Sequence, residues 1–182
     1  MNNAKPFLDA AAIDHLLEEM LIALRGRLAA CGIADPAMIG IHRGGVWLAE
    51  RLHRRLQLPE PLGTLGIAFY RDDFTRIGRH PEVHPSNLPF GVDDRHILLV
   101  DDVLQTGRTI RAAMNEIFDY GRPASITLLA LAEREGRELP IQPDIVGIRP
   151  ALERRQQIKL VGPDPLSLVI QEPVAAAPPQ AA

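Results

Sequence analysis

Residues 97–118 contain, in order, a short apolar run, two adjacent carboxylates, a small polar loop and an amphipathic pattern. Four consecutive apolar residues, 97–100, are typical of a strand buried on both faces in the middle of a parallel sheet. We expect Asp101 and Asp102 to end this strand. Apolar residues then recur with the helical period, at Ile110, Ala113, Met114, Ile117 and Phe118. This order predicts an α/β fold with a central parallel sheet.

The loop between this strand and helix has the residue types of a ribose phosphate site. In open α/β sheets, ligands bind beyond the carboxyl ends of the strands, against the next helix. Backbone N–H groups at a helix N-terminus, beside the Thr106 and Thr109 hydroxyls, suit a phosphate. Asp101 and Asp102 suit ribose hydroxyls or a hydrated Mg²⁺, which prefers oxygen ligands. The alternative is an ordinary strand, turn and capped helix; a Walker loop is excluded because no Gly-Lys-Ser/Thr follows the strand.

A second strand–loop–helix unit repeats this layout closer to the N-terminus. Residues 38–41 have a short buried-strand pattern, and His42-Arg43-Gly44-Gly45 precede a helical pattern. Two glycines let the backbone approach a ligand closely, and Arg43 adds a fixed positive charge. The loop therefore suits an anion such as pyrophosphate, with a plain glycine turn as the alternative.

The remaining patterns complete a single domain over residues 8–172. Asp9 can cap a helix that closes near Gly32. Further strand patterns occur at 62–70, 125–132, 144–147, 158–161 and 166–170. The last two predict a closing hairpin, which with the N-terminal segment would form a small hood. Residues 75–89 lack periodicity, which indicates a functional lid or disorder, and the Ala/Pro-rich residues 173–182 predict a disordered tail.

Composition and charge are those of an ordinary globular protein, with 46% hydrophobic and 24% charged residues. The single cysteine, Cys31, cannot form an intramolecular disulfide and fits a reducing compartment. The start of the chain lacks a signal-peptide pattern and no run of about 18 apolar residues occurs, so we expect a cytoplasmic protein without a membrane span. Because the net charge is −3, nucleic-acid binding would need a local basic face. Such a cluster, or a merely solvated helix face, is formed by Arg51, His53, Arg54 and Arg55.

The segment from Val100 to Thr109 resembles the phosphoribosyl-pyrophosphate signature of the type I phosphoribosyltransferases. Further segments resemble one branch of that family, the pyrimidine operon regulators with uracil phosphoribosyltransferase activity (PyrR). They are residues 70–74 (Tyr-Arg-Asp-Asp-Phe), 111–113, 121–126 and 133–141. The resemblance covers about residues 8–170. It implies the type I phosphoribosyltransferase fold, in which helices flank a central parallel sheet and a small hood and a flexible lid loop complete the site.

The resemblance also implies a role for each matching residue. Thr106 to Thr109 would hold the 5′-phosphate of phosphoribosyl pyrophosphate, and Asp101 and Asp102 would bind the ribose hydroxyls. Asp102 and Asp101 are the catalytic residues predicted in this way, with an acid–base part for Asp102. Arg43 and the lid residue Arg71 would neutralise pyrophosphate. Mg²⁺ is the expected cofactor, without dedicated protein ligands, and family members are usually homo-oligomers. The substrate-binding residues predicted in this way are His42, Arg43, Gly44, Arg71, Asp101, Asp102, Val103, Leu104, Gln105, Thr106, Gly107, Arg108, Thr109 and Arg134.

Three segments depart from the PyrR pattern. Residues 42–45 replace Lys-Thr-Arg-Gly, Glu133 and Gly136 replace an aspartate and a histidine, and residues 148–155 lack an Asn-x-Pro-Thr-Ser motif. The predicted reaction converts uracil and phosphoribosyl pyrophosphate into UMP and pyrophosphate. Two alternatives stay open: a nucleotide-sensing regulator that binds an mRNA leader with little or no catalysis, and a phosphoribosyltransferase for another base, which the altered segment after Gly147 favours.

Overall fold

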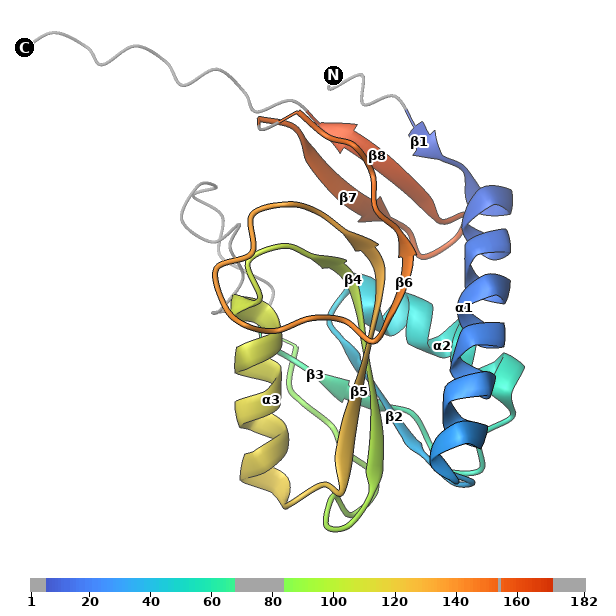
Figure 1. The fold of residues 1–182 in the computed structure, drawn as a ribbon, viewed down its shortest axis with the longest axis vertical. Coiled ribbons are helices and arrows are strands. Elements are labelled where there is room, and N and C mark those ends of the chain that lie inside the picture. Colours follow the sequence, from blue (N-terminus) through green and yellow to red (C-terminus); the bar gives the residue numbers. More distant parts are fainter. Residues whose placement is uncertain (1–5, 68–83, 154, 172–182) are drawn as a thin grey trace, which may run out of the picture.

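The computed structural model describes residues 6–67, 84–153 and 155–171, which form one large sheet and one small sheet (Figure 1). The large sheet is parallel, with the strand order β3-β2-β4-β5-β6. Its strands are β2 (Ala37–Ile41), β3 (Gly63–Leu65), β4 (His96–Leu104), β5 (Ser125–Glu133) and β6 (Ile145–Ile148). β4 lies at the centre between β2 and β5, so the predicted α/β fold is confirmed.

In the described part of the chain, three helices cover the two faces of this sheet (Figure 1). α1 (Ala10–Cys31) and α2 (Gly44–Leu56) lie on one face, and α3 (Arg108–Tyr120) lies on the other. The predicted capping of α1 is confirmed: Asp9 Oδ1 accepts a hydrogen bond from the Ala12 N–H at 2.9 Å, and Gly32 ends the helix in the left-handed region at φ 67°.

The apolar run in β4 serves both faces because successive side chains of a strand point in opposite directions. Leu98 and Val100 join the core under α1 and α2, whereas Ile97 and Leu99 join the core under α3. All four side chains are buried. The run of four apolar residues is therefore explained by a central strand covered on both sides.

The small sheet forms the predicted hood from the two ends of the described chain. Its strands are β1 (Pro6–Leu8), β7 (Gln157–Val161) and β8 (Ser167–Gln171), in the antiparallel order β1-β8-β7. The predicted hairpin is confirmed. β1 was not predicted, because three residues are too few to show an alternating pattern.

Three details of the sequence-based prediction are wrong. β4 does not end at the two aspartates but continues to Leu104, because β5 pairs with it as far as Glu133. Phe118 is 57% exposed, because it lies one step round the helix from the buried Ile117 and points away from the sheet. β3 ends at Leu65, since the Gly66 N–H donates to the Ser86 hydroxyl at 2.8 Å instead of continuing the strand ladder. Most of the predicted lid, and the predicted tail, lie outside the described residues.

Candidate active site

Two carboxylates lie buried near the carboxyl end of the central strand. Asp101 is 2% exposed and Asp102 is 6% exposed. Asp101 Oδ1 accepts a hydrogen bond from the Asp102 N–H at 3.0 Å, which fixes the first carboxylate relative to the backbone. Removing a carboxylate from water is costly. Two buried neighbours at the ligand-binding edge of a parallel sheet therefore indicate a binding role rather than a role in solubility.

Residues 104–109, here called the phosphate loop, connect β4 to the N-terminus of α3. Gly107 has φ 91° and stands at the helix cap, in the left-handed region that favours glycine. The Thr106 hydroxyl accepts a hydrogen bond from the Arg108 N–H at 3.1 Å, and the Gly107 carbonyl accepts from the Arg111 N–H at 2.9 Å. The loop therefore directs the positive end of a helix, together with threonine hydroxyls, to the strand end that carries the carboxylates.

The second predicted anion site, residues 42–45, packs directly against these carboxylates. We call these residues the glycine loop. A Cβ atom on Gly44 would overlap the Asp102 carboxylate, and one on Gly45 would overlap the Val100 carbonyl oxygen. Only glycine permits this approach without displacement. The peptide between His42 and Arg43 is cis, and the His42 N–H donates to the Leu65 carbonyl at 2.9 Å.

His42 stacks on His84, which follows the undescribed residues 68–83. The ring centroids are 4.6 Å apart and the rings are 14° from parallel. Burial lowers the pKa of His42 below its usual value, and charge on His84 and Arg43 lowers this pKa further. The imidazole of His42 is therefore biased towards its neutral form. His84 has no predicted role, because nothing in the sequence connects it to His42.

Residues 134–141, here called the bracing segment, follow β5 and attach to the phosphate loop. The Leu104 carbonyl accepts from the Arg134 N–H at 3.0 Å. The Thr106 carbonyl accepts from the N–H groups of Glu138 and Leu139, at 3.0 and 3.1 Å. The Arg137 guanidinium donates to the Gln105 carbonyl at 2.5 Å. The sequence of this segment resembles PyrR, but no local pattern marks Arg137 as a partner of the loop.

The other predicted site residues differ in where their side chains lie. Leu104 is 1% exposed within the core, so only its backbone can face a ligand. Arg108 is exposed and its Nε donates to Glu138 at 2.7 Å. Arg134 donates from its guanidinium to the Gln156 carbonyl at 2.7 Å. Val103 is half-buried at the edge of the core, and Arg71 lies outside the described residues.

The donor set near Asp101 and Asp102 fits a cation only if a ligand supplies further oxygens. Within the described ranges, no three His, Cys, Asp or Glu side chains form a cluster that could hold a metal ion. Mg²⁺ commonly binds to one or two carboxylates together with water and substrate phosphates. The two buried carboxylates fit that pattern.

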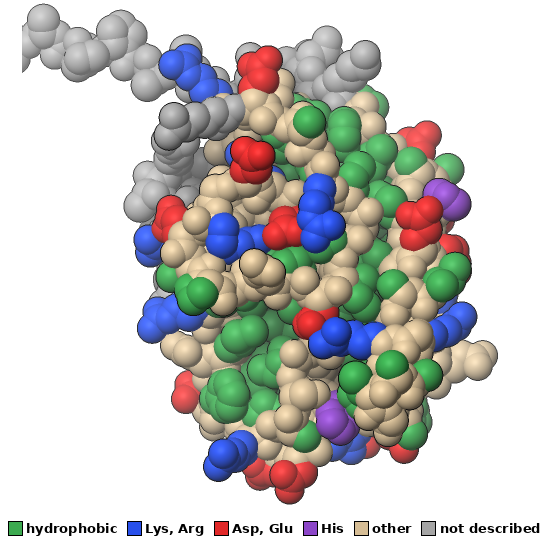
Figure 2. Space-filling view, in the orientation of Figure 1, with side chains coloured by type: hydrophobic (Ala, Val, Ile, Leu, Met, Phe, Trp, Pro, Cys, Tyr) green, Lys and Arg blue, Asp and Glu red, His purple; other side chains and the backbone are tan. Residues whose placement is uncertain are grey.

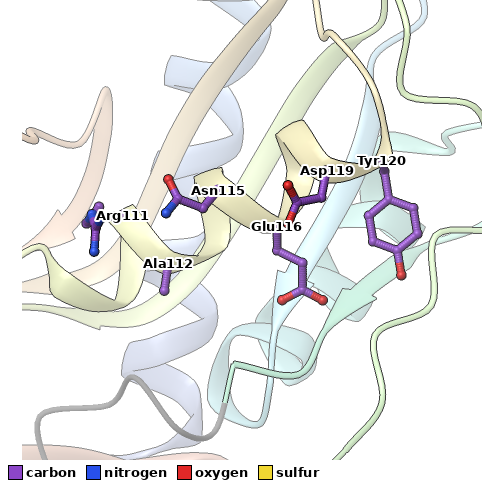
Figure 3. A pocket seen from close by; sticks show the side chains of 6 residues that line it. All are labelled: Arg111, Ala112, Asn115, Glu116, Asp119 and Tyr120. Carbon is purple, nitrogen blue, oxygen red and sulfur yellow. The ribbon is translucent and has the colours of Figure 1, made fainter.

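A groove runs along α3 (Figure 3). It is lined by Arg111, Ala112, Asn115, Glu116, Asp119 and Tyr120, all from that helix. It follows α3 towards its C-terminal end, whereas the phosphate loop lies at the N-terminal end. Two of its lining residues are acidic, which does not favour a phosphate.

Comparisons with known proteins show the family and the fold of this chain. The family model described as "Phosphoribosyl transferase domain" matches residues 9–175. The chain is 63% identical over 161 residues to "Bifunctional protein PyrR" of Nitrosococcus oceani, covering 87% of this chain and 91% of that protein. It is 59% identical over 153 residues to the protein of the same name from Pseudomonas aeruginosa, covering 84% and 90%. The crystal structure of hypoxanthine phosphoribosyltransferase of Trypanosoma cruzi has the same fold, with a TM-score of 0.67 at 19% identity over 93% of this chain and 97% of that one.

Proposed function

The chain belongs to the phosphoribosyl transferase family and, within it, to the PyrR proteins, and we propose that it transfers a phosphoribosyl group to uracil. Phosphoribosyl pyrophosphate and uracil are the substrates, and UMP and pyrophosphate are the products. The observation that carries the proposal is the meeting of three features at one edge of the sheet: the buried carboxylates Asp101 and Asp102, the phosphate loop and the glycine loop.

Each part of the substrate has a complementary feature in this arrangement. The N-terminus of α3 with Thr106 and Thr109 holds the 5′-phosphate, and Asp101 and Asp102 bind the ribose hydroxyls. The glycine loop receives the pyrophosphate, and Arg43 supplies positive charge. During transfer, the bond from C1′ to the pyrophosphate oxygen breaks, and a bond from C1′ to N1 of uracil forms with loss of the N1 proton. We assign the acid–base part to Asp102, which lies against the glycine loop.

Catalysis at such a site depends on position and charge more than on covalent chemistry. Asp101 and Asp102 would hold Mg²⁺ together with the substrate, and the ion would supply positive charge for the leaving pyrophosphate. Arg71 is proposed as a second cation for that group. A lid formed by the segment around Arg71 would exclude water, which otherwise competes with uracil for the ribosyl carbon.

Regulation through RNA is the second activity that we propose, because the relatives are named bifunctional PyrR proteins. In this role the UMP-bound protein would bind an mRNA leader. The basic cluster on α2 does not by itself support an RNA surface: Arg55 pairs with Asp14 and Glu18, Arg51 donates to the Pro163 carbonyl, and His53 bonds to Glu60. Figure 2 shows positive and negative side chains interspersed over one face of the molecule.

The cellular setting follows from the proposed activity. We propose a homo-oligomer that works in the cytoplasm, where nucleotide precursors and mRNA are available. Of the helices in the described ranges, none is both long and apolar enough to cross a membrane.

The direct test is a panel of bases incubated with the purified protein, phosphoribosyl pyrophosphate and Mg²⁺, with pyrophosphate release as the measurement. We expect release with uracil alone. Pyrophosphate release with a purine or another pyrimidine would show that uracil is the wrong base, whereas the phosphoribosyl site would still be assigned correctly. A protein that binds UMP but releases nothing with any base would instead be a sensor without catalysis.

A further inference from the structure

The bracing segment holds the phosphate loop through its backbone and through one long side chain. Arg137 Nη1 donates to the Gln105 carbonyl at 2.5 Å, and its Nη2 pairs with Glu133 Oε1 at 2.7 Å. The side chains of both charged partners are mostly buried, 23% exposed for Arg137 and 19% for Glu133. One guanidinium thus joins the end of β5 to the middle of the phosphate loop.

Local geometry brings Arg137 back to the loop. Gly136 has φ 105°, which turns the chain immediately before Arg137, and it lies against the Gln105 side chain. The Arg137 stem also packs beside Gly107, with Cδ 3.8 Å from the position that a Cβ of Gly107 would occupy. Arg137 therefore bonds to Gln105 and lies beside Gly107 of the phosphate loop.

Glu133 fixes the direction of this guanidinium. Its Oε1 pairs with Arg137, and its Oε2 accepts from Arg149 Nε at 2.9 Å. The carboxylate is thereby held between two guanidinium groups, one of which is that of Arg137. A planar guanidinium can donate to a carbonyl and a carboxylate at once in a fixed fork, which an ammonium cannot reproduce.

We propose that Arg137 is a positioning residue for the 5′-phosphate of the nucleotide, and that it acts by holding the Gln105 carbonyl and hence the shape of the phosphate loop. This inference rests on the proposed function, because it assigns the 5′-phosphate to that loop. Arg137 acts through the loop backbone and not through its net charge. Loss of Arg137 lowers the affinity for ligands that carry a 5′-phosphate and leaves the affinity for ligands without one unchanged.

The test compares Arg137→Gln and Arg137→Lys with Arg122→Gln, a matched control. Arg122 is exposed beyond the far end of α3, and its contacts to Asp93 and Asp94 are made by its backbone. Calorimetry measures the affinity for UMP and for uridine, and steady-state kinetics measures KM for phosphoribosyl pyrophosphate and for uracil.

We expect Arg137→Gln to lower the affinity for UMP by about tenfold or more, since a charge-assisted hydrogen bond is lost. The KM for phosphoribosyl pyrophosphate should rise by a similar factor. Uridine affinity and KM for uracil should stay within about twofold, and Arg137→Lys should recover little. If Arg137→Lys restored the full affinity for UMP, the positive charge alone would be responsible. If the affinities for UMP and uridine fell equally, Arg137 would have a general structural role. Either result, or an unchanged UMP affinity, overturns the proposal.

Glu133→Gln provides an independent variant if the Arg137 variants fold poorly. It keeps the guanidinium but removes the carboxylate that aligns it, so the same selective loss of UMP affinity is expected to a smaller extent. An equal effect on uridine would again count against the proposal. The outcome is separable from that of the proposed function: absence of turnover in the wild-type protein refutes the enzyme, whereas the comparison of UMP with uridine still tests Arg137.

Discussion

Asp102 carries the sharpest prediction at the scale of single residues. Asp102→Asn keeps the size of the side chain but removes its charge, so the packing against Gly44 should persist. We expect turnover to fall by about 10²- to 10³-fold, because one preorganised charged group at the reacting centre is lost. Pyrophosphate release measures turnover, and circular dichroism checks that the fold is intact.

Asp119→Asn is the matched control for that variant. Asp119 is exposed on α3, away from the phosphate loop, and its loss of charge is the same. Turnover should stay at the wild-type level. Near-normal turnover in Asp102→Asn would remove the assignment of Asp102 to the chemistry.

Some features of the candidate site follow from the sequence, and others do not, for a physical reason. The shared position of Asp101, Asp102 and Thr106 follows from the sequence because they are close together and accompany a recognisable strand. Arg137 and His84 were missed because their partners, Gln105 and His42, lie more than thirty residues away in each case. Contacts of that kind depend on the tertiary fold, and no local pattern encodes them.

At the scale of elements, the contact between the glycine loop and the end of β4 predicts a specific sensitivity. Gly44→Ala would place a methyl group on the Asp102 carboxylate, so either the side chain or the loop must move. We expect turnover to fall by at least about tenfold and stability to fall by about 1–3 kcal/mol, the usual cost of overpacking. Thermal unfolding and pyrophosphate release measure the two effects.

Gly26→Ala is the control, because it makes the same substitution at a position with free space. Gly26 lies within α1, where a Cβ would meet no atom within 4 Å. Alanine should stabilise the helix by about 0.5–1 kcal/mol and leave turnover unchanged. If both glycine variants had the same effect on turnover, the close approach of Gly44 to Asp102 would not be the cause.

Elements with a strong internal period were predicted more reliably than their ends. α1 and α3 follow from caps and from the apolar spacing, and β4 and β5 follow from their apolar runs. The ends of β3 and β4 were wrong, because pairing with a neighbouring strand decides where a strand stops. That pairing is not visible in the strand's own residues.

At the scale of the whole molecule, the hood and the parallel sheet share one core. Leu160 and Leu168 of the hood belong to the same buried cluster as Leu17 of α1 and Leu98 of β4. The single tryptophan, Trp47, packs against Gly162 between β7 and β8. Tryptophan fluorescence therefore reports on the hood, whereas far-ultraviolet circular dichroism reports on the whole chain.

We expect the two signals to coincide during denaturant unfolding, as in a single cooperative transition. Leu168→Ala should lower the unfolding free energy by about 2–5 kcal/mol through a cavity in the shared core, with the signals still coincident. Val161→Ala, at an exposed hood position, should change it by less than about 0.5 kcal/mol. A fluorescence change that precedes the change in circular dichroism would show that the hood unfolds separately.

The hydrogen bonds between the bracing segment and the phosphate loop also determine in which direction the peptide groups of that loop point. The carbonyls of Leu104, Gln105 and Thr106 each accept from the bracing segment. In a planar trans peptide the C=O and the following N–H point in opposite directions, so the adjoining N–H groups turn to the other side. The side of the loop opposite the bracing segment would then present N–H groups of residues 105–107 to the proposed phosphate. A phosphate bound there, as proposed, would be held by oriented neutral peptides, so we expect its binding to depend less on ionic strength than binding to mobile lysine or arginine side chains.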